Sequence, residues 1–261
     1  MTAAVAQLFR HRELLYMLTR RDISIKYKQS VMGVMWAILM PALIVSAGVL
    51  VRVAFSKVSG VPVTLLEVAA VSVKALPWAF VVSAIRFATA SLTSNSNLVT
   101  KISFPREVLP ISAVLSQAFD LMIAGAMLVV LLAVLGVKAT LLLWWVPVLL
   151  TILALLAVTV GLFLSAANLF FRDVKYLVEV IVTFAIFFTP VFYDTALFGP
   201  SGRWLLFNPV APLLEGLSAV IVYGRAPELA WVAYSAALSV GGLFLGWAFF
   251  KKVEPTFAER V

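Results

Sequence analysis

The chain lacks cysteine altogether and has only one histidine among its 261 residues. Without cysteine it forms no disulfide and has no thiol nucleophile or Cys-ligated metal site. His11 lies between two arginines near the N-terminus, away from any acidic cluster, so no metal site is expected. A single histidine also excludes an H-E-x-x-H metalloprotease helix, which needs two.

Phosphate-binding and paired acidic motifs are missing as well. The sequence contains no G-x-x-x-x-G-K-[ST], so it has no loop of this kind to cradle the phosphates of ATP. No carboxylates have the spacing of a Mg²⁺ site, which argues against a prenyl-phosphate transferase. These absences predict a protein that moves a substrate without transforming it, with no catalytic residues, metal or cofactor of its own.

Charged residues are scarce and apolar residues abundant. The chain is 12% charged and 63% apolar, whereas soluble domains are about 25% charged and about 45–50% apolar. This composition predicts a membrane protein. The net charge of +8 is then informative about membrane topology and does not indicate nucleic-acid binding, because lysine and arginine are retained on the cytoplasmic side of the membrane. The first thirty residues contain no apolar signal-peptide core, so we expect the N-terminus in the cytoplasm.

Six apolar runs approach the length of about 20 residues that a helix needs to cross a bilayer. They are residues 31–51, 68–93, 109–137, 141–169, 177–193 and 229–250. Residues 5–18 precede them and predict an interfacial amphipathic helix, with an ordinary water-facing helix as the alternative. Residues 205–223 are also apolar, but their prolines and Glu215 favour a short re-entrant or interfacial helix over about 213–223.

The distribution of basic residues favours six spans with both termini in the cytoplasm. This topology places thirteen of the twenty Lys and Arg residues inside and five outside, whereas a seventh span gives ten against eight. The predicted fold is therefore an all-α membrane protein of six transmembrane helices. Residues 1–30 form a cytoplasmic N-terminal segment, residues 31–250 the transmembrane domain, and residues 251–261 a cytoplasmic tail.

Arg86 and Asp120 are charges within the second and third predicted spans, and each lies seventeen residues from residue 103. In an antiparallel hairpin they lie at similar depth, roughly 10–15 Å from the cytoplasmic face. We therefore predict an intramembrane ion pair between them. Two alternatives stay open: each side chain faces a wet cavity alone, or Arg86 binds an anionic group of the substrate.

Several features suggest a transport path. Thr189 and Pro190 end the fifth span early and, with the half-helix 213–223, are expected to cap its outer mouth; an ordinary helix end is the alternative. Aromatic side chains along a path stack on sugar rings, although interfacial belts explain most membrane aromatics. Gly242 and Gly246 form a G-x-x-x-G, which predicts close helix packing. The channel candidates are Trp36, Trp78, Arg86, Phe184, Phe187, Phe188 and Tyr193.

The polar, basic stretch 95–110 lies between the second and third spans, on the predicted cytoplasmic side. Its simplest interpretation is a loop. Its richer interpretation is a docking element for a separate subunit, since the chain itself has no phosphate-binding loop.

Seven stretches together resemble the membrane subunit of ABC-2 type polysaccharide exporters, which include O-antigen, capsule and teichoic-acid permeases. They are RRDISIKYKQSVMGVMWAILMP (20–41), LPWAF (76–80), NLVTKISFPREVLP (97–110), NLFFRDVKYL (168–177), FFTPVFY (187–193), NPVAP (208–212) and FKKVEPTFAE (250–259). They occur in the family's order, and the chain is most similar to permeases of lipid-linked O-antigen exporters. A drug or small-lipid exporter of the same fold and a membrane-embedded glycan-assembly enzyme are the alternatives.

The resemblance implies a homodimer in the bacterial inner membrane, with a channel between its two copies. It implies two copies of a separate ATPase subunit, sometimes carrying a carbohydrate-binding domain, on which ATP and Mg²⁺ bind. The implied substrate is a polysaccharide on undecaprenyl pyrophosphate.

The resemblance also implies roles for individual residues. The element that couples to the ATPase comprises Asn97, Leu98, Lys101, Phe104, Pro105, Arg106 and Glu107. A cytoplasmic gate comprises Arg20, Arg21, Asp22, Lys26, Tyr27 and Lys28. Residues 194–228 hold short outer gate helices, and the outer gate residues are Pro190, Asn208, Pro209 and Pro212. Lys74 and Arg86 match no motif of the family.

Overall fold

The computed structural model describes residues 10–28, 35–59, 63–102 and 104–257, and all regular structure within these ranges is helical. The α-helices are α2 (Arg12–Lys28), α3 (Met35–Ser59), α4 (Leu65–Ser94), α5 (Ser96–Lys101), α6 (Val108–Val134), α7 (Trp145–Phe170), α8 (Val174–Phe184), α9 (Ala211–Ile221) and α10 (Leu229–Val253). The 3₁₀ segments are η1 (Leu141–Trp144), η2 (Ala185–Phe188), η3 (Thr195–Phe207) and η4 (Glu254–Thr256).

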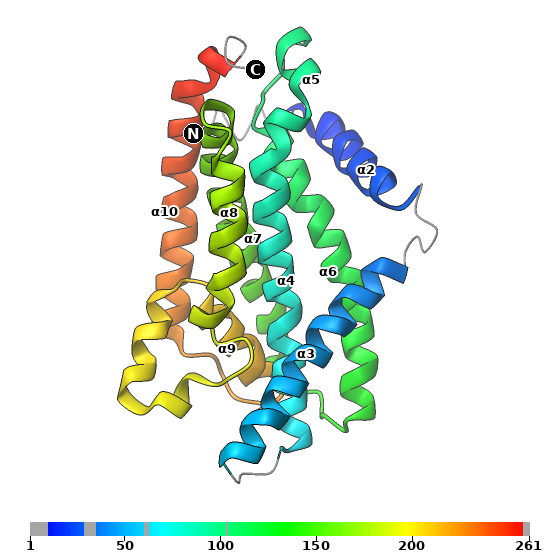
Figure 1. Ribbon diagram of the computed structural model, residues 1–261, viewed down its shortest axis with the longest axis vertical. Helices are drawn as coiled ribbons and strands as arrows, with labels where there is room; N and C mark the ends of the chain where they lie inside the picture. The colour runs from blue at the N-terminus through cyan, green and yellow to red at the C-terminus, as the bar shows by residue number, and fades with distance from the viewer. Residues whose placement is uncertain (1–9, 29–34, 60–62, 103, 258–261) are drawn as a thin grey trace.

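The central helix of the bundle is α4, which packs against α3, α6, α7, α8 and α9 (Figure 1). Its inner faces carry small side chains, and Ala84 and Ala88 are fully buried. A Cβ atom at Gly161 of α7 would lie 2.7 Å from the Cβ of Ala88. The close approach of α4 and α7 therefore depends on glycine at this position, as is common where helices pack in membranes.

Different elements gather at the two ends of the bundle. One end, at the top of Figure 1, holds α2, α5, the turn between α7 and α8, and the C-terminal end of α10. The opposite end holds the C-terminal end of α3, the connection between α6 and α7, η3 and α9. The segments expected in the cytoplasm thus lie together at one end.

Four helical segments are long and apolar enough to cross a membrane, counting only the described residues. They are Leu65–Ser94, Val108–Val134, Leu141–Phe170 and Leu229–Thr256. They confirm the predicted second, third, fourth and sixth spans, with ends that shift by a few residues. The protein is a multi-pass helical membrane protein with these four candidate spans.

The first predicted span, residues 31–51, differs from α3, which continues to Ser59. Arg52 lies within this helix, and its guanidinium forms an ion pair with Glu67, in the first turn of α4. The apolar part of α3 is short and runs from Ala42 to Ala54. Residues 31–34 of the predicted span lie outside the described residues.

The fifth predicted span is much shorter than expected. α8 begins at Val174 and ends at Phe184, and η2 then tightens the chain up to Phe188. Thr189 is extended, with φ −123° and ψ 131°. A residue before proline is disfavoured in the helical region, so Pro190 accounts for the extended Thr189 and for the end of the helix.

Two further helices also differ in their bounds from their predictions. α9 confirms a short helix in place of a seventh span, with bounds shifted by two residues from 213–223. At the N-terminal end, α2 extends through Lys28, well beyond the predicted 5–18, and it packs against α6 with Leu18 buried. Residues 1–9 of that predicted helix lie outside the described residues.

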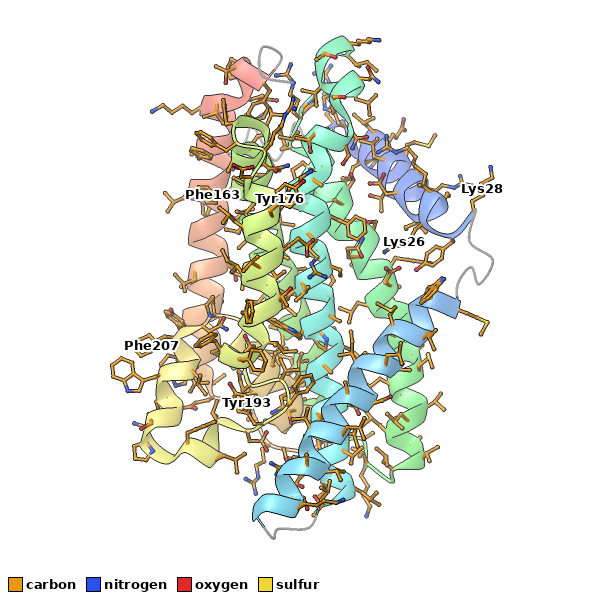
Figure 2. The ribbon with its side chains drawn as sticks, in the orientation of Figure 1. Lys26, Lys28, Phe163, Tyr176, Tyr193 and Phe207 are labelled. Carbon is orange, nitrogen blue, oxygen red and sulfur yellow. The ribbon has the colours of Figure 1, made fainter. Side chains whose placement is uncertain are left out.

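The predicted G-x-x-x-G contact is confirmed between α10 and α7. A Cβ atom at Gly242 would lie 2.7 Å from Cγ2 of Thr159, and one at Gly246 would lie 3.0 Å from the ring of Phe163 (Figure 2). The hydroxyl of Thr159 also donates a hydrogen bond to the carbonyl of Ser239, at 3.0 Å. Missing side chains on α10 thus allow its backbone to approach α7.

Candidate functional site

The predicted coupling stretch forms a compact turn at the end of the bundle that is expected in the cytoplasm, built around the short helix α5. Val99 points inward and is fully buried, and Leu98 is half-buried. Asn97 and Lys101 are exposed. The turn therefore has a buried anchor and a polar outer surface, which is what a docking element requires.

Arg106 and Glu107 act as internal braces of this turn. The guanidinium of Arg106 donates to the carbonyl of Val99 at 3.1 Å and to that of Glu254 at 2.5 Å. Its backbone N–H donates to the carboxylate of Glu254 at 3.0 Å. Glu107 is fully buried, and Lys251 lies 2.8 Å from its carboxylate. These contacts tie the coupling turn to the C-terminal end of α10.

The two remaining coupling candidates are not exposed either. Pro105 is buried and Phe104 is half-buried. Sequence reasoning placed all seven residues on the ATPase surface, but the structure leaves Asn97 and Lys101 as the exposed ones. Sequence reasoning missed Lys251 and Glu254. Their contacts with the turn cannot be recognised from residue spacing, because they lie about 150 residues further along the chain.

The N-terminal gate segment is attached to α6 by an ionic cluster around Asp120. Lys26 forms an ion pair with Asp120, and Tyr27 donates a hydrogen bond to the same carboxylate. Lys26 also donates to the side chain of Gln117 at 2.9 Å. Burial raises the pKa of the Tyr27 hydroxyl, and the hydrogen bond to Asp120 raises it further, so this hydroxyl stays protonated and remains a donor.

The rest of the gate segment contacts the coupling turn. Arg21 pairs with Asp22 and donates a hydrogen bond to the side chain of Asn95, both at 2.8 Å. Asn95 is the residue between α4 and α5. Arg20 and Lys28 are exposed. The gate segment is therefore connected to both α6 and the coupling turn.

The predicted ion pair between Arg86 and Asp120 is wrong. Arg86 lies 2.8 Å from the carboxylate of Glu179 on α8, and it donates to the hydroxyl of Thr183 at 3.3 Å. Equal depth along two antiparallel helices does not determine the faces on which side chains lie. Here Arg86 faces α8, while Asp120 faces α2.

A buried lysine holds together the opposite end of the bundle, where the outer gate is predicted. Lys74 of α4 is 1% exposed and lies 2.6 Å from the carboxylate of Asp194. It donates to the carbonyl of Tyr193 at 2.7 Å and lies 3.7 Å from Glu215 of α9. Glu215 also accepts a hydrogen bond from the backbone N–H of Thr195, at 3.1 Å. Lys74 therefore joins α4 to both predicted outer gate segments.

The outer gate candidates surround this cluster. The side chain of Asn208 donates to the hydroxyl of Thr189 at 2.9 Å, which joins the chain before α9 to the chain after η2. Pro190 and Pro212 are buried, and Pro209 is half-buried. These residues pack the outer end, and none of them is fully open to solvent.

The aromatic channel candidates differ in how far they are exposed. Trp78 is 6% exposed and lies in the main apolar core, so this single chain does not present it on a surface. Trp36, Phe184, Phe187 and Phe188 are exposed on α3, α8 and η2. Tyr193 is half-buried, and its hydroxyl donates to the carbonyl of Phe187 at 2.9 Å (Figure 2).

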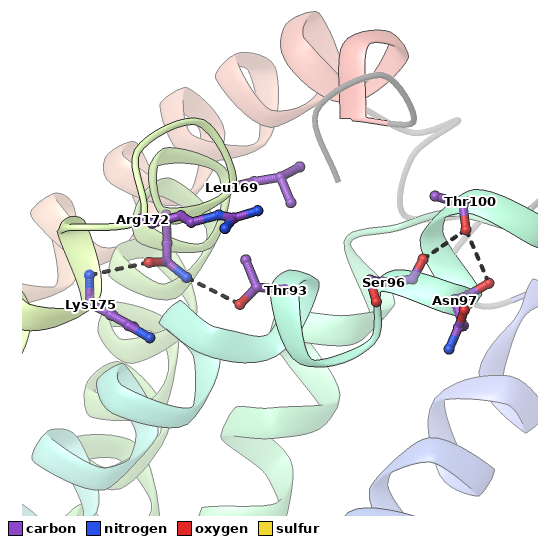
Figure 3. A pocket seen from close by; sticks show the side chains of 8 residues that line it. Thr93, Ser96, Asn97, Thr100, Leu169, Arg172 and Lys175 are labelled. Carbon is purple, nitrogen blue, oxygen red and sulfur yellow. Dashed lines mark hydrogen bonds between the residues drawn. The ribbon is translucent and has the colours of Figure 1, made fainter.

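A polar cavity of about 590 Å³ opens between α5 and the turn that joins α7 to α8 (Figure 3). Its lining residues are Thr93, Ser96, Asn97, Thr100, Asn168, Leu169, Arg172 and Lys175. Asn168 positions both walls, because its side chain donates to the carbonyl of Thr89 at 3.1 Å and accepts from the backbone N–H of Lys175 at 3.2 Å. This cavity was not among the features predicted from the sequence.

Comparison with known proteins assigns the chain to a family. Residues 13–222 match the family model described as ABC-2 type transporter. The chain is 27% identical to the O-antigen export system permease protein RfbA of Myxococcus xanthus, with both chains covered in full. It is 25% identical to an O-antigen export system permease protein RfbA of Klebsiella pneumoniae, over 95% of this chain and 94% of the relative. The chain belongs to the ABC-2 type transporter family, and is a membrane permease of that class.

Proposed function

We propose that this chain is the permease subunit of an ATP-driven exporter that moves lipid-linked O-antigen, or a related polysaccharide, across the bacterial inner membrane. The polysaccharide assignment is supported by similarity over the full length to permeases named for O-antigen export. ATP is hydrolysed by a separate ATPase subunit, which an ABC permease requires as its partner.

The observation that carries this proposal is the construction of the coupling turn. Asn97 and Lys101 are exposed at its surface, while Val99, Arg106 and Glu107 attach it to the bundle. A force applied to the exposed surface is therefore transmitted to the helices and does not merely bend a loop.

The helix α4 provides a mechanical connection to the outer end. Ser94 is at the cytoplasmic end of α4, and Lys74 lies twenty residues before it. This separation corresponds to about 30 Å along the helix at 1.5 Å per residue. Lys74 holds Asp194 and Glu215 at the outer end. We propose that displacement of the coupling turn moves α4 and thereby changes the contacts of the outer gate.

Two copies of the chain and two ATPase subunits form the working transporter in this proposal, and the polymer passes between the two copies. α3 and α8 with η2 complete six crossings with the four candidate spans, and both termini lie in the cytoplasm. The exposed aromatic residues of α3, α8 and η2 are available to stack on sugar rings along that path.

The test is the display of polysaccharide at the cell surface. A strain without this gene should retain polymer in the cytoplasm, and normal display in that strain would exclude the function. Lys101→Glu should weaken ATPase binding without lowering the melting temperature. Lys252→Glu, which changes another exposed lysine near the same end, is the matched control. ATPase binding by Lys101→Glu at the wild-type level would refute the docking role of this surface.

A further inference from the structure

A second cavity, of about 610 Å³, is an apolar groove that begins at the end of the bundle opposite the coupling turn (Figure 1). It is lined by α4, α6, α7 and α9 and by the connection between α6 and α7. Among its described lining residues, Lys138 alone carries a charge, and none comes from α3, α8 or η2. The groove is therefore separate from the transport path proposed above.

The groove has the length of one leaflet of a bilayer. The helix α6 contributes one face to it, which includes Leu121, Gly125, Leu128 and Leu132. Leu121 and Leu132 are eleven positions apart, which corresponds to about 17 Å at 1.5 Å per residue. The hydrocarbon core of a bilayer is about 30 Å thick, so each leaflet takes up about 15 Å of it. The groove can therefore accommodate a lipid acyl chain along its length.

Gly125 lies at the middle of this wall and leaves the groove open there. A Cβ atom at this position would meet no atom within 4 Å, so no neighbouring helix of the chain fills the space in front of it. By contrast, a Cβ atom at Gly161 or Gly242 would lie 2.7 Å from a side chain of the adjoining helix. The missing side chain at Gly125 thus widens the groove and does not serve close packing within the chain.

The rim of the groove is apolar and faces outward. Val129 lines the groove and is 67% exposed, and Val134 of the same helix is 80% exposed. Both belong to a candidate membrane span, so hydrocarbon surrounds them. Contacts between membrane helices favour small residues, whereas valine and leucine line this rim. A lipid chain therefore suits the groove better than a second helix does.

Lys138 places a positive charge at the end of the groove. It lies just after Gly136, whose φ of 73° terminates α6. Lys138 is exposed and has no acidic partner among the residues that the structure describes. Trp144, 57% exposed in η1, marks the level of the lipid headgroups, where tryptophan is enriched. A lipid whose chain fills the groove would therefore have its phosphate near Lys138.

We propose that this groove binds a phospholipid with a negatively charged headgroup, with the acyl chain against α6 and α7 and the phosphate at Lys138. Phosphatidylglycerol keeps the negative charge of its phosphate, whereas the amine of phosphatidylethanolamine balances it, so the lysine favours phosphatidylglycerol. The lining also includes Leu76 of α4 and Leu217 of α9, the helices that Lys74 and Glu215 join. The bound lipid stabilises this end of the bundle. The site does not depend on which substrate is exported.

The experiment counts the phospholipids that the full chain retains, by native mass spectrometry after extraction from vesicles with equal amounts of phosphatidylglycerol and phosphatidylethanolamine. The wild type should retain phosphatidylglycerol preferentially. Gly125→Leu, which fills the groove, should lose most of it. Lys138→Gln should reduce the preference about twofold to fivefold, as expected for one exposed ion pair. Gly241→Leu and Lys57→Gln are the matched controls, at an open glycine of α10 and an exposed lysine of α3, and should behave as the wild type does.

Thermal unfolding tests the effect on stability. Phosphatidylglycerol added to the wild type in detergent should raise the melting temperature, because a ligand that binds only the folded state stabilises it. It should have little effect on Gly125→Leu. The melting temperature without added lipid establishes that each variant is folded, and if Gly125→Leu does not fold, Lys138→Gln decides the matter.

Four results would overturn the proposal. Wild-type retention of phosphatidylglycerol by Gly125→Leu excludes the groove as the site. A wild-type preference in Lys138→Gln, or no preference in the wild type, excludes recognition of the headgroup charge. Displacement of phosphatidylglycerol by undecaprenyl diphosphate assigns the groove to the exported lipid. Dissociation of a wild-type dimer in Gly125→Leu, with unchanged lipid content, makes the groove an interface between two copies of the chain.

Discussion

Replacing Lys74 by methionine removes the cation from the ionic cluster that it forms with Asp194 and Glu215, at the end of the bundle opposite the coupling turn. The change retains most of the side-chain volume, so its main effect is electrostatic. It leaves Asp194 and Glu215 facing each other, and both are partly enclosed, with side chains 32% and 25% exposed. Removing one partner of a fully buried pair costs about 3–5 kcal/mol. Because water reaches both carboxylates, we expect a smaller loss here, about 2–3 kcal/mol.

This loss should be visible as a lower melting temperature. About 1 kcal/mol corresponds to roughly 2–4 °C for a chain of 150–250 residues, so the expected decrease is about 4–12 °C. The seven tryptophans of the chain allow the transition to be followed by intrinsic fluorescence in detergent. Lys57→Met is the matched control, since Lys57 is an exposed lysine of α3 at the same end.

A rescue variant makes the reasoning refutable. Adding Asp194→Asn and Glu215→Gln to Lys74→Met removes the facing charges and should recover part of the lost stability. If Lys74→Met has the melting temperature of the wild type, or if the triple variant is no more stable than Lys74→Met, the ion cluster does not stabilise this end of the bundle. In the proposed transport cycle, the single variant should also export less polymer.

Three further predictions concern helix contacts. Asp120→Asn removes the charge that holds Lys26 and should lower the free energy of unfolding by about 1–2 kcal/mol, with faster proteolysis of α2. Arg86→Glu and Glu179→Arg should each reduce the yield of folded protein, because each leaves like charges at membrane depth, where one charge costs about 2.5–3.5 kcal/mol; the double swap should restore it. Gly242→Ala should destabilise the contact of α10 with α7 by about 1–3 kcal/mol, measured by thermal unfolding.

Each of these predictions has its own contrary outcome. Wild-type protection of α2 in Asp120→Asn would show that apolar contacts alone hold it. A double swap no better than its single changes would refute the pairing of Arg86 with Glu179. Gly241→Ala is the control for Gly242→Ala, since a Cβ at Gly241 meets nothing within 4 Å. Equal effects of the two alanines would mean that helix propensity, and not packing, decides the outcome.

The sequence by itself determined where long apolar helices lie, because hydrocarbon requires about 20 apolar residues whose backbone groups are bonded within the helix. That requirement is local and is visible in composition, so four spans were predicted within a few residues. The same reasoning identified the short helix α9, since prolines and Glu215 interrupt its surroundings. It also identified the close approach at Gly242, which depends on a missing side chain.

Only the tertiary structure decided which charged residues meet. Arg86 and Asp120 were predicted at one depth but face different helices, and Arg52 is paired with Glu67 of the next helix. Lys74 lies 120 positions before the carboxylate that balances it, and Arg106 is braced by a residue 148 positions away. Periodicity along one helix gives the face of a side chain relative to its neighbours in sequence. It cannot give the rotation of that helix about its axis relative to the others, which depends on packing of the whole bundle.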